Sequence, residues 1–230
     1  MSGRTLIVGA APLSGADDFY RGLVCSADRL IAADAGAAVC RSVGRTPDVC
    51  VGDFDSIDQA TLAWLRESGA DLHCHPVDKD ASDLDLAVDL ARENGATALD
   101  ITAAFSGRID HTLAAFGTLA RAAELVPRAL EPSFTGYVIG ARGAVRLELE
   151  EVPGTTISLF ALDGEVSLTT TGLRYAMEAA PLPRYTSLGL SNRAHSPRQV
   201  IEVLSGRVLC IVSRYETDDG WAVLQRDPGR

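Results

Sequence analysis

The sequence predicts an α/β domain with a mainly parallel sheet over residues 1–129, followed by an all-β domain over residues 130–230. Up to about residue 125, short apolar runs alternate with segments of helical periodicity, which is typical of βαβ units. After the proline-bearing stretch VPRALEPSF (126–134), the runs alternate at period two, as in VRLELE (145–150) and GEVSLTTT (164–171). Turn pairs such as Asp163-Gly164 separate these runs, so we expect antiparallel strands in the second part.

The first domain has readable strands and helix boundaries. Ser56 and Gln59 predict a capping box for a helix that Gly69 ends. Ser82 predicts the N-cap of another helix, which Gly95 ends. The candidate strands are the apolar runs at residues 6–8, 30–33, 49–51, 72–77 and 99–105.

Composition excludes some classes of partner. The net charge of -10 argues against nucleic acid and anionic membranes, because both need a basic surface. A cationic ligand or a metal-neutralised anion fits an acidic chain better. The hydrophobic fraction of 47% is typical of a soluble globular protein, and no stretch has the length of a membrane span or the flanks of a signal peptide.

The five cysteines are odd in number, scattered, and form no C-x-x-C pair. This pattern predicts neither a disulfide framework nor a zinc site. We therefore expect a reducing compartment, the cytoplasm.

The stretch VGDFDSI (51–57) places two acids at the end of an apolar run. Asp53 and Asp55 are two residues apart, so they can point to one side if the strand geometry persists, and Gly52 permits a tight turn. Carboxylate oxygens of this kind suit magnesium. The alternative is a solvated loop whose acids only begin the next helix.

A second acidic group, DKDASDLD (78–85), follows the next apolar run. Asp83 and Asp85 fall in the first turn of the helix that Ser82 caps, where the helix dipole favours carboxylates, and this alone could explain them. Two acidic groups at successive strand ends would also repel, by about 4 kcal/mol per close pair at an effective dielectric of about 20. A bound cation would relieve that repulsion.

The third element is SGRIDH (106–111), again between a strand and a helix. Ser106 and Gly107 would offer backbone N–H groups at a helix N-terminus, and Arg108 adds a planar fork for phosphate. Asp110 and His111 follow directly. Acids at two strand ends with an anion cradle at a third match the needs of a metal-bound polyphosphate.

These blocks resemble the thiamine pyrophosphokinase family. The matching blocks occur in the family's order and are ADAGA (33–37), PDVCVGDFDSI (47–57), DKDASD (78–83), SGRIDH (106–111), TTTGLRY (169–175) and LSN (190–192). The resemblance implies transfer of the pyrophosphoryl group of ATP to thiamine, giving thiamine diphosphate and AMP. It also implies an ATP- and magnesium-binding α/β domain, a thiamine-binding β-sandwich, and a homodimer with active sites at the subunit interface.

The resemblance also implies roles for particular residues. Magnesium would be held by Asp53, Asp55 and Asp83, with Asp80 nearby. Arg108 would clamp phosphate, and Asp110 would be an acid on the substrate side. The implied nucleotide contacts also include Asp34, Gly36, Ser106, Gly107 and His111, and the implied thiamine contacts are Tyr175, which would stack on the ligand, with Ser191 and Asn192.

Three alternatives stay open at the level of the sequence. A hydroxymethylpterin diphosphokinase-like enzyme would share the GDFDS-type site, although TTTGLRY and LSN favour thiamine. A phosphatase with an aspartyl nucleophile also uses a D-x-D signature, but usually at the start of the chain. A nucleotide or thiamine sensor without activity is the third, and a turnover assay separates it from an enzyme.

Overall fold

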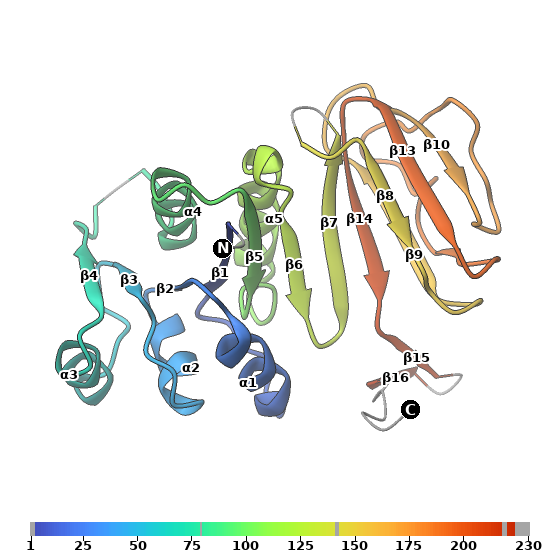
Figure 1. Cartoon of the computed structure of the whole chain (residues 1–230). Coiled ribbons are helices and arrows are strands. Elements are labelled where there is room, and N and C mark those ends of the chain that lie inside the picture. Colours follow the sequence, from blue (N-terminus) through green and yellow to red (C-terminus); the bar gives the residue numbers. More distant parts are fainter. Residues whose placement is uncertain (1–2, 79, 141–142, 218–219, 224–230) are drawn as a thin grey trace. The chain divides into compact units, whose positions relative to one another are not determined.

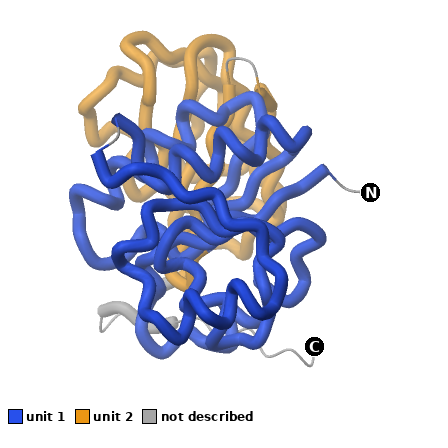
Figure 2. Tube along the Cα trace, turned by 90° about the vertical axis from the view of Figure 1, so that its left-hand side faces the viewer, with its two compact units in different colours: residues 1–130 blue, residues 131–230 orange. Residues whose placement is uncertain are grey.

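The protein is described by a computed structural model (Figure 1) over residues 3–217 and 220–223, except residues 79 and 141–142. The chain divides into two compact units, residues 1–130 and 131–230 (Figure 2). Within the described residues, every helix is too short or too polar to cross a membrane.

The first unit is an α/β fold. Its strands form a parallel sheet in the order β6-β5-β1-β2-β3-β4. In chain order its elements are β1 (Arg4–Val8), α1 (Asp17–Ser26), β2 (Leu30–Ala33), α2 (Gly36–Ser42), β3 (Val49–Gly52), α3 (Gln59–Glu67), β4 (Asp71–Cys74), α4 (Asp83–Glu93), β5 (Ala98–Thr102), α5 (Ile109–Arg121), the 3-10 turn η1 (Ala123–Leu125) and β6 (Arg128–Glu131).

Helices cover both faces of this sheet, which explains why its central strands β1, β2 and β3 are mainly buried apolar runs. Tyr20 and Val24 of α1 and Leu65 of α3 share one core cluster with Leu6 and Val8 of β1. On the other face, α4 packs against β1, β2 and β3. The carboxyl ends of the parallel strands therefore meet at one edge, where the loops that lead into the helices can carry a site.

Two helix starts test the predicted capping. Ser82 is the N-cap of α4 and forms a capping box with Asp85, which confirms the prediction there. The predicted capping box of Ser56 and Gln59 is wrong, because Asp58 is the N-cap of α3. Its carboxylate accepts the Thr61 backbone N–H at 2.9 Å and the Thr61 hydroxyl at 2.6 Å, so the helix starts at Gln59.

The second unit is an antiparallel β-sandwich, as expected. Its two sheets have the orders β12-β9-β14-β7 and β11-β10-β13-β8. Ile157, Leu159 and Val208 from the first sheet and Leu168 and Ile201 from the second belong to one buried cluster. The strands are β7 (Phe134–Gly140), β8 (Arg146–Leu149), β9 (Thr156–Ala161), β10 (Ser167–Thr171), β11 (Ala180–Pro181), β12 (Asn192–Arg193), β13 (Gln199–Ser205) and β14 (Arg207–Ser213), with a separate antiparallel pair of β15 (Tyr215–Thr217) and β16 (Gly220–Val223).

Candidate active site

Three aspartates meet at the carboxyl ends of β2 and β3. Asp34 directly follows β2, and Asp53 and Asp55 follow β3. Each of the three offers a carboxylate oxygen, and these oxygens lie within 4.8 Å of one another. Positive φ angles at Asp34 (46°) and Phe54 (64°) turn the chain sharply at both strand ends. Oxygen ligands at such separations can surround a hard divalent cation.

Asp83 lies beside this group. A Cβ atom on Gly52 would lie 3.0 Å from Cβ of Asp34 and 3.3 Å from Oδ1 of Asp83, so both acids flank the end of β3. Only a glycine fits easily in this space, because contacts that short are rare for a real Cβ. The tight three-oxygen group contains Asp34, which the sequence had suggested only as a nucleotide contact, while Asp83 lies next to it.

The electrostatics of the group favour a cation. Burial raises the pKa of Asp34, and the neighbouring carboxylates of Asp83 and Asp53 add to this effect, while hydrogen bonds from the Ala35 backbone and the Ser56 side chain oppose it. Within the described part of the chain, Oδ1 of Asp34 is buried and has no hydrogen-bond partner. A divalent cation would supply the missing partner and offset the repulsion, so the residues present fit magnesium.

The raised pKa of Asp34 predicts that Asp34→Asn stabilises the metal-free protein at neutral pH. A carboxyl group with a raised folded-state pKa binds its proton more tightly than in the unfolded chain, so stability falls as pH rises through that pKa. Replacing the charge with a neutral amide removes this loss. We expect a higher Tm than wild type at pH 7 in chelator, measured by calorimetry.

Two further measurements complete this prediction. The stability difference should shrink in acid, where the wild-type carboxyl group is protonated, and Mg²⁺ should raise the Tm of wild type but not of Asp34→Asn. A variant that is less stable than wild type at pH 7 in chelator would show that the Asp34 carboxylate is not strained in the metal-free fold.

The third predicted element, the loop between β5 and α5, is held in place by its own contacts. The Ser106 hydroxyl donates to the carbonyl oxygen of Ala11, and Gly107 has a φ of 80°. The Arg108 fork donates to both oxygens of Asp110, at 3.1 Å from Nε and 2.6 Å from Nη2. The guanidinium lowers the pKa of the Asp110 carboxyl group to about 2, although both side chains are exposed. Arg108 is thus a charged fork at the start of α5, held by a neighbour two residues away.

The remaining predicted residues of the first unit are more open. Asp80 and His111 are exposed, and neither belongs to the three-oxygen group. Gly36 begins α2, and a Cβ there would lie 2.1 Å from the Val8 carbonyl oxygen. Gly36 therefore allows α2 to pack closely on β1.

The predicted thiamine residues lie in the second unit. Tyr175 is 62% exposed, and the Arg174 guanidinium lies 5.7 Å from the centre of its ring. Asn192 is buried and its side chain holds the backbone of Tyr175: Oδ1 accepts the Tyr175 N–H at 3.0 Å, and Nδ2 donates to the Tyr175 carbonyl oxygen at 2.7 Å. Ser191 is exposed, and its N–H donates to the Ser158 hydroxyl. Asn192 therefore orients Tyr175, a role that its sequence position did not reveal.

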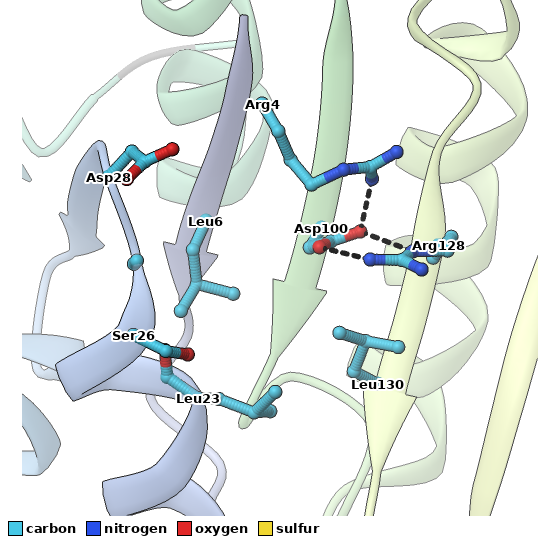
Figure 3. Close-up of a pocket in the computed structure, with 9 residues that line it drawn as sticks. Arg4, Leu6, Leu23, Ser26, Asp28, Asp100, Arg128 and Leu130 are labelled. Carbon is cyan, nitrogen blue, oxygen red and sulfur yellow. Dashed lines mark hydrogen bonds and ion pairs between the residues drawn. The ribbon is translucent and has the colours of Figure 1, made fainter. Parts of the chain in front are cut away.

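A hollow of about 290 Å³ lies away from the acids, near the amino ends of β1 and β6 (Figure 3). There the buried carboxylate of Asp100 accepts one hydrogen bond from Arg4 and two from Arg128, each at 2.7 Å. These ion pairs tie β5 to its two neighbouring strands. The hollow is therefore explained by structural ion pairing and adds no group to the acidic site.

Two family models match the chain over most of its length. The catalytic domain of thiamin pyrophosphokinase matches residues 20–128, and the vitamin B1 binding domain of the same enzyme matches residues 144–208. The chain belongs to the thiamine pyrophosphokinase family. The acids and Arg108 fall within the first match, and Tyr175 and Asn192 within the second.

Individual relatives agree with this family. The thiamine pyrophosphokinase of Bacillus subtilis (strain 168) is 26% identical over 191 residues, which cover 80% of this chain and 86% of the relative. A crystal structure of the Bacillus subtilis enzyme matches with a TM-score of 0.77 at 24% identity, covering 91% of this chain and 98% of that one. The enzyme of Candida albicans matches with a TM-score of 0.75 at 14% identity, over 91% and 89% of the two chains, and shows the shared fold.

Family membership settles the reaction class. The chain is an enzyme, a transferase that passes a pyrophosphoryl group to thiamine. The vitamin B1 binding model favours thiamine over a hydroxymethylpterin as the acceptor. The interpretation as a phosphatase finds no support, because both models match a pyrophosphokinase.

Proposed function

We propose that this thiamine pyrophosphokinase uses ATP as its donor and holds Mg²⁺ with Asp34, Asp53 and Asp55, beside Asp83. One observation carries the metal assignment: three carboxylate oxygens lie within 4.8 Å of one another at the ends of two adjacent parallel strands. The buried and unpartnered oxygen of Asp34 supports it, since nothing else in the described residues balances that atom.

The reaction joins the hydroxyethyl oxygen of thiamine to the β-phosphorus of ATP. The bond from that phosphorus to the α,β-bridging oxygen breaks, AMP leaves, and the hydroxyl proton is lost. Bound magnesium would neutralise the triphosphate so that an alcohol can approach it. The protein's own contribution is to hold the two reactants in line, because such transfers need little covalent help.

The phosphate end would be held by the loop that precedes α5. Its first-turn N–H groups favour an anion, and the Arg108 fork can bind two phosphate oxygens. In the proposal, the phosphate end also includes the predicted nucleotide-site residues Asp110, Ser106, Gly107, His111 and Asp80. The exposure of Arg108 and Asp110 supports it, since their mutual ion pair can open toward a ligand.

Arg108→Lys is expected to reduce turnover strongly although it conserves the charge. Lysine offers a point charge and cannot donate two parallel hydrogen bonds, so we expect a loss of about 10-fold or more in kcat/KM. The measurement is the steady-state rate of AMP formation at varied ATP. Arg41→Lys is the matched control, because Arg41 contacts Thr61 and Asp58 and lies outside the proposed phosphate loop. Near-wild-type kinetics for Arg108→Lys would mean that the Arg108 guanidinium does not bind phosphate through two hydrogen bonds.

The thiamine end would be formed by Tyr175 and Ser191, with Asn192 fixing the Tyr175 backbone. An aromatic face stacked on the cationic thiazolium contributes roughly 0.5–2 kcal/mol. The exposure of the Tyr175 ring supports this role, because an exposed ring is available to a ligand.

We also propose that the enzyme is a cytoplasmic homodimer with active sites shared between subunits. Ile109 and Leu113, one turn apart on α5, are 72% and 66% exposed. Apolar side chains at this spacing form a stripe on the helix that follows Arg108, and a second subunit could cover it. All five cysteines are free thiols, which fits a reducing compartment.

A single assay tests the proposed function. Purified protein is incubated with ATP and Mg²⁺ together with thiamine, and in parallel with a hydroxymethylpterin, and AMP and the diphosphate product are quantified. We expect AMP and thiamine diphosphate in equal amounts, and neither product in chelator. AMP formation only with the pterin would move the acceptor to the alternative class, and binding of thiamine without turnover would indicate a sensor.

A further inference from the structure

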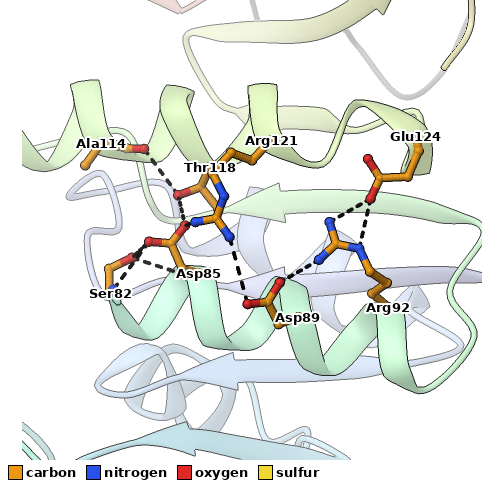
Figure 4. A network of polar contacts seen from close by, with 8 residues as sticks. All are labelled: Ser82, Asp85, Asp89, Arg92, Ala114, Thr118, Arg121 and Glu124. Atoms are coloured by element: carbon orange, nitrogen blue, oxygen red, sulfur yellow. Dashed lines mark hydrogen bonds and ion pairs between the residues drawn. The ribbon is translucent and has the colours of Figure 1, made fainter. Parts of the chain in front are cut away.

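Helices α4 and α5 lie side by side, run in the same direction, and are joined by a row of polar contacts (Figure 4). The row begins near the start of α4, where Asp85 meets Thr118 and Arg121 of α5. It ends near the end of α4, where Arg92 donates to Glu124 in the turn after α5. The Asp85 end of the row also includes the capping box that begins α4, whereas the other end consists of the contact between Arg92 and Glu124.

Asp85 divides its two carboxylate oxygens between the two helices. Oδ2 accepts the Ser82 backbone N–H at 3.3 Å and the Ser82 hydroxyl at 2.8 Å, as part of the capping box that begins α4. Oδ1 accepts the Thr118 hydroxyl at 2.8 Å and Nη1 of Arg121 at 2.7 Å. The Asp85 side chain is 18% exposed, so solvent screens its bond with Thr118 little, whereas the Arg121 side chain is 57% exposed and its ion pair is screened more.

Asp83 lies between the two ends of that capping box. Residues two apart on a helix leave it about 200° apart, so Asp83 and Asp85 point to opposite sides. Asp83 reaches the end of β3, with Oδ1 at 3.3 Å from the position of a Cβ on Gly52, and Asp85 reaches α5. The turn that carries Asp83 is therefore fixed by a carboxylate that is itself anchored on α5.

Helix α5 also follows directly on the loop that we propose to bind phosphate. Arg108 is the N-cap of α5, and Thr118 lies about three turns further along, or about 15 Å at the helical rise. The first turns of α5 thus extend away from the Asp85 contact as a rigid segment. One carboxylate links the turn that holds Asp83 to the helix that presents Arg108.

We propose that Asp85 is a positioning residue, which holds Asp83 at the metal site and sets its distance from Arg108 through Thr118 and Arg121. This proposal rests on the metal and phosphate roles proposed above. Residues outside the first coordination shell commonly change metal affinity or activity by about 10- to 100-fold when they are replaced.

The test breaks the Asp85 anchor by changing residues of α5 only, although Arg121→Gln also removes the longer ion pair of Arg121 with Asp89 at 3.9 Å. In the double variant Thr118→Val, Arg121→Gln, the Ser82–Asp85 capping box keeps all its atoms. Affinity for Mn²⁺ is measured by electron paramagnetic resonance on the folded protein without substrates, and kcat and KM for ATP are measured separately. We expect Mn²⁺ affinity to fall by about 10-fold and the KM for ATP to rise.

Glu124→Gln is the matched control, because it weakens a separate bridge between the same helical segments, far from Asp83. It should match wild type in Mn²⁺ affinity and in both kinetic constants. Thr118→Val alone serves if the double variant does not fold, with a smaller shift in the same direction. Its Mn²⁺ affinity is then compared with that of Glu124→Gln, and the Tm of both variants is measured so that a general loss of stability can be separated from a loss of metal binding.

A loss of Tm with unchanged Mn²⁺ affinity and unchanged kinetics would overturn the proposal, because the contacts would then only hold the helices together. Equal losses of Mn²⁺ affinity in Glu124→Gln and in the double variant would overturn it as well. The proposed function fails in a different way: wild type would bind no Mn²⁺, or Asp53→Asn would bind it as wild type does. Either result removes the metal site and this proposal with it.

Discussion

Asp53→Asn is expected to abolish turnover while the fold stays intact. The substitution removes one of three carboxylates whose oxygens lie within 4.8 Å of one another, so the remaining ligands should capture magnesium poorly. We expect kcat/KM to fall by at least about 100-fold, since loss of a coordinating group exceeds the effect of losing an outer-shell partner. The Tm should hold or rise, because the repulsion among the acids is relieved. The measurements are AMP formation at varied ATP, up to saturation, and a thermal melt.

The same loop supplies the control. Asp58 is an acid five residues further on, but its carboxylate caps α3. Asparagine caps helices about as well as aspartate, so Asp58→Asn removes the same charge and should leave turnover and stability near wild type. Asp55→Asn should behave like Asp53→Asn. Full activity of Asp53→Asn at saturating ATP would contradict the metal assignment, and equal losses in all three variants would point to net charge alone.

Mixed dimers should recover activity from two inactive parents. In the proposed homodimer, one subunit supplies the metal acids of a site and the other supplies Tyr175. Asp83→Asn and Tyr175→Ala are each expected to inactivate the homodimer. When the two variants are unfolded and refolded together, a mixed dimer would have one site with both lesions and one site with neither. The mixture should then regain up to about a quarter of wild-type activity, because half of the dimers are mixed and half of their sites are intact.

The composition of the mixture decides how that result is interpreted. Heterodimers are confirmed by native mass spectrometry, and each parent refolded alone is the control. If every site is built within one chain, each site keeps a lesion and the mixture stays inactive. An inactive mixture that contains verified heterodimers would therefore contradict the shared-site proposal.

Local sequence signals determined much of the fold of the first unit. The Ser82 cap, the stop at Gly95 and the apolar runs of β1, β2 and β3 depend on neighbours within a few residues, and the structure has them where they were expected. The change to period-two runs likewise predicted antiparallel strands in the second unit, and the structure has them. The capping of α3 was misjudged because Ser56 and Asp58 are both capping residue types. In the structure the Ser56 hydroxyl donates to Asp55, and the Asp58 carboxylate accepts both the N–H and the hydroxyl of Thr61.

The membership of the acidic site could be only partly deduced from the sequence. The motif placed Asp53 and Asp55 together because they are two residues apart. Asp34 follows its own strand in the same way, and that signal could have suggested it as a metal ligand. The sequence does not state that β2 and β3 are neighbours, and only their pairing in the sheet brings Asp34 to the other two acids.

The tertiary structure alone decided which polar side chains hold others in place. Asn192 was expected at the thiamine site from its motif, and the structure shows in addition that it is buried and bonded to the backbone of Tyr175, 17 residues away. Asp85 was expected only to begin a helix, yet its second oxygen is bonded to Thr118 and Arg121, 33 and 36 residues away. A carboxylate or an amide has more bonding positions than its local helix or turn can fill. Which distant group fills the remainder depends on the packing of whole elements, and no spacing in the sequence encodes it.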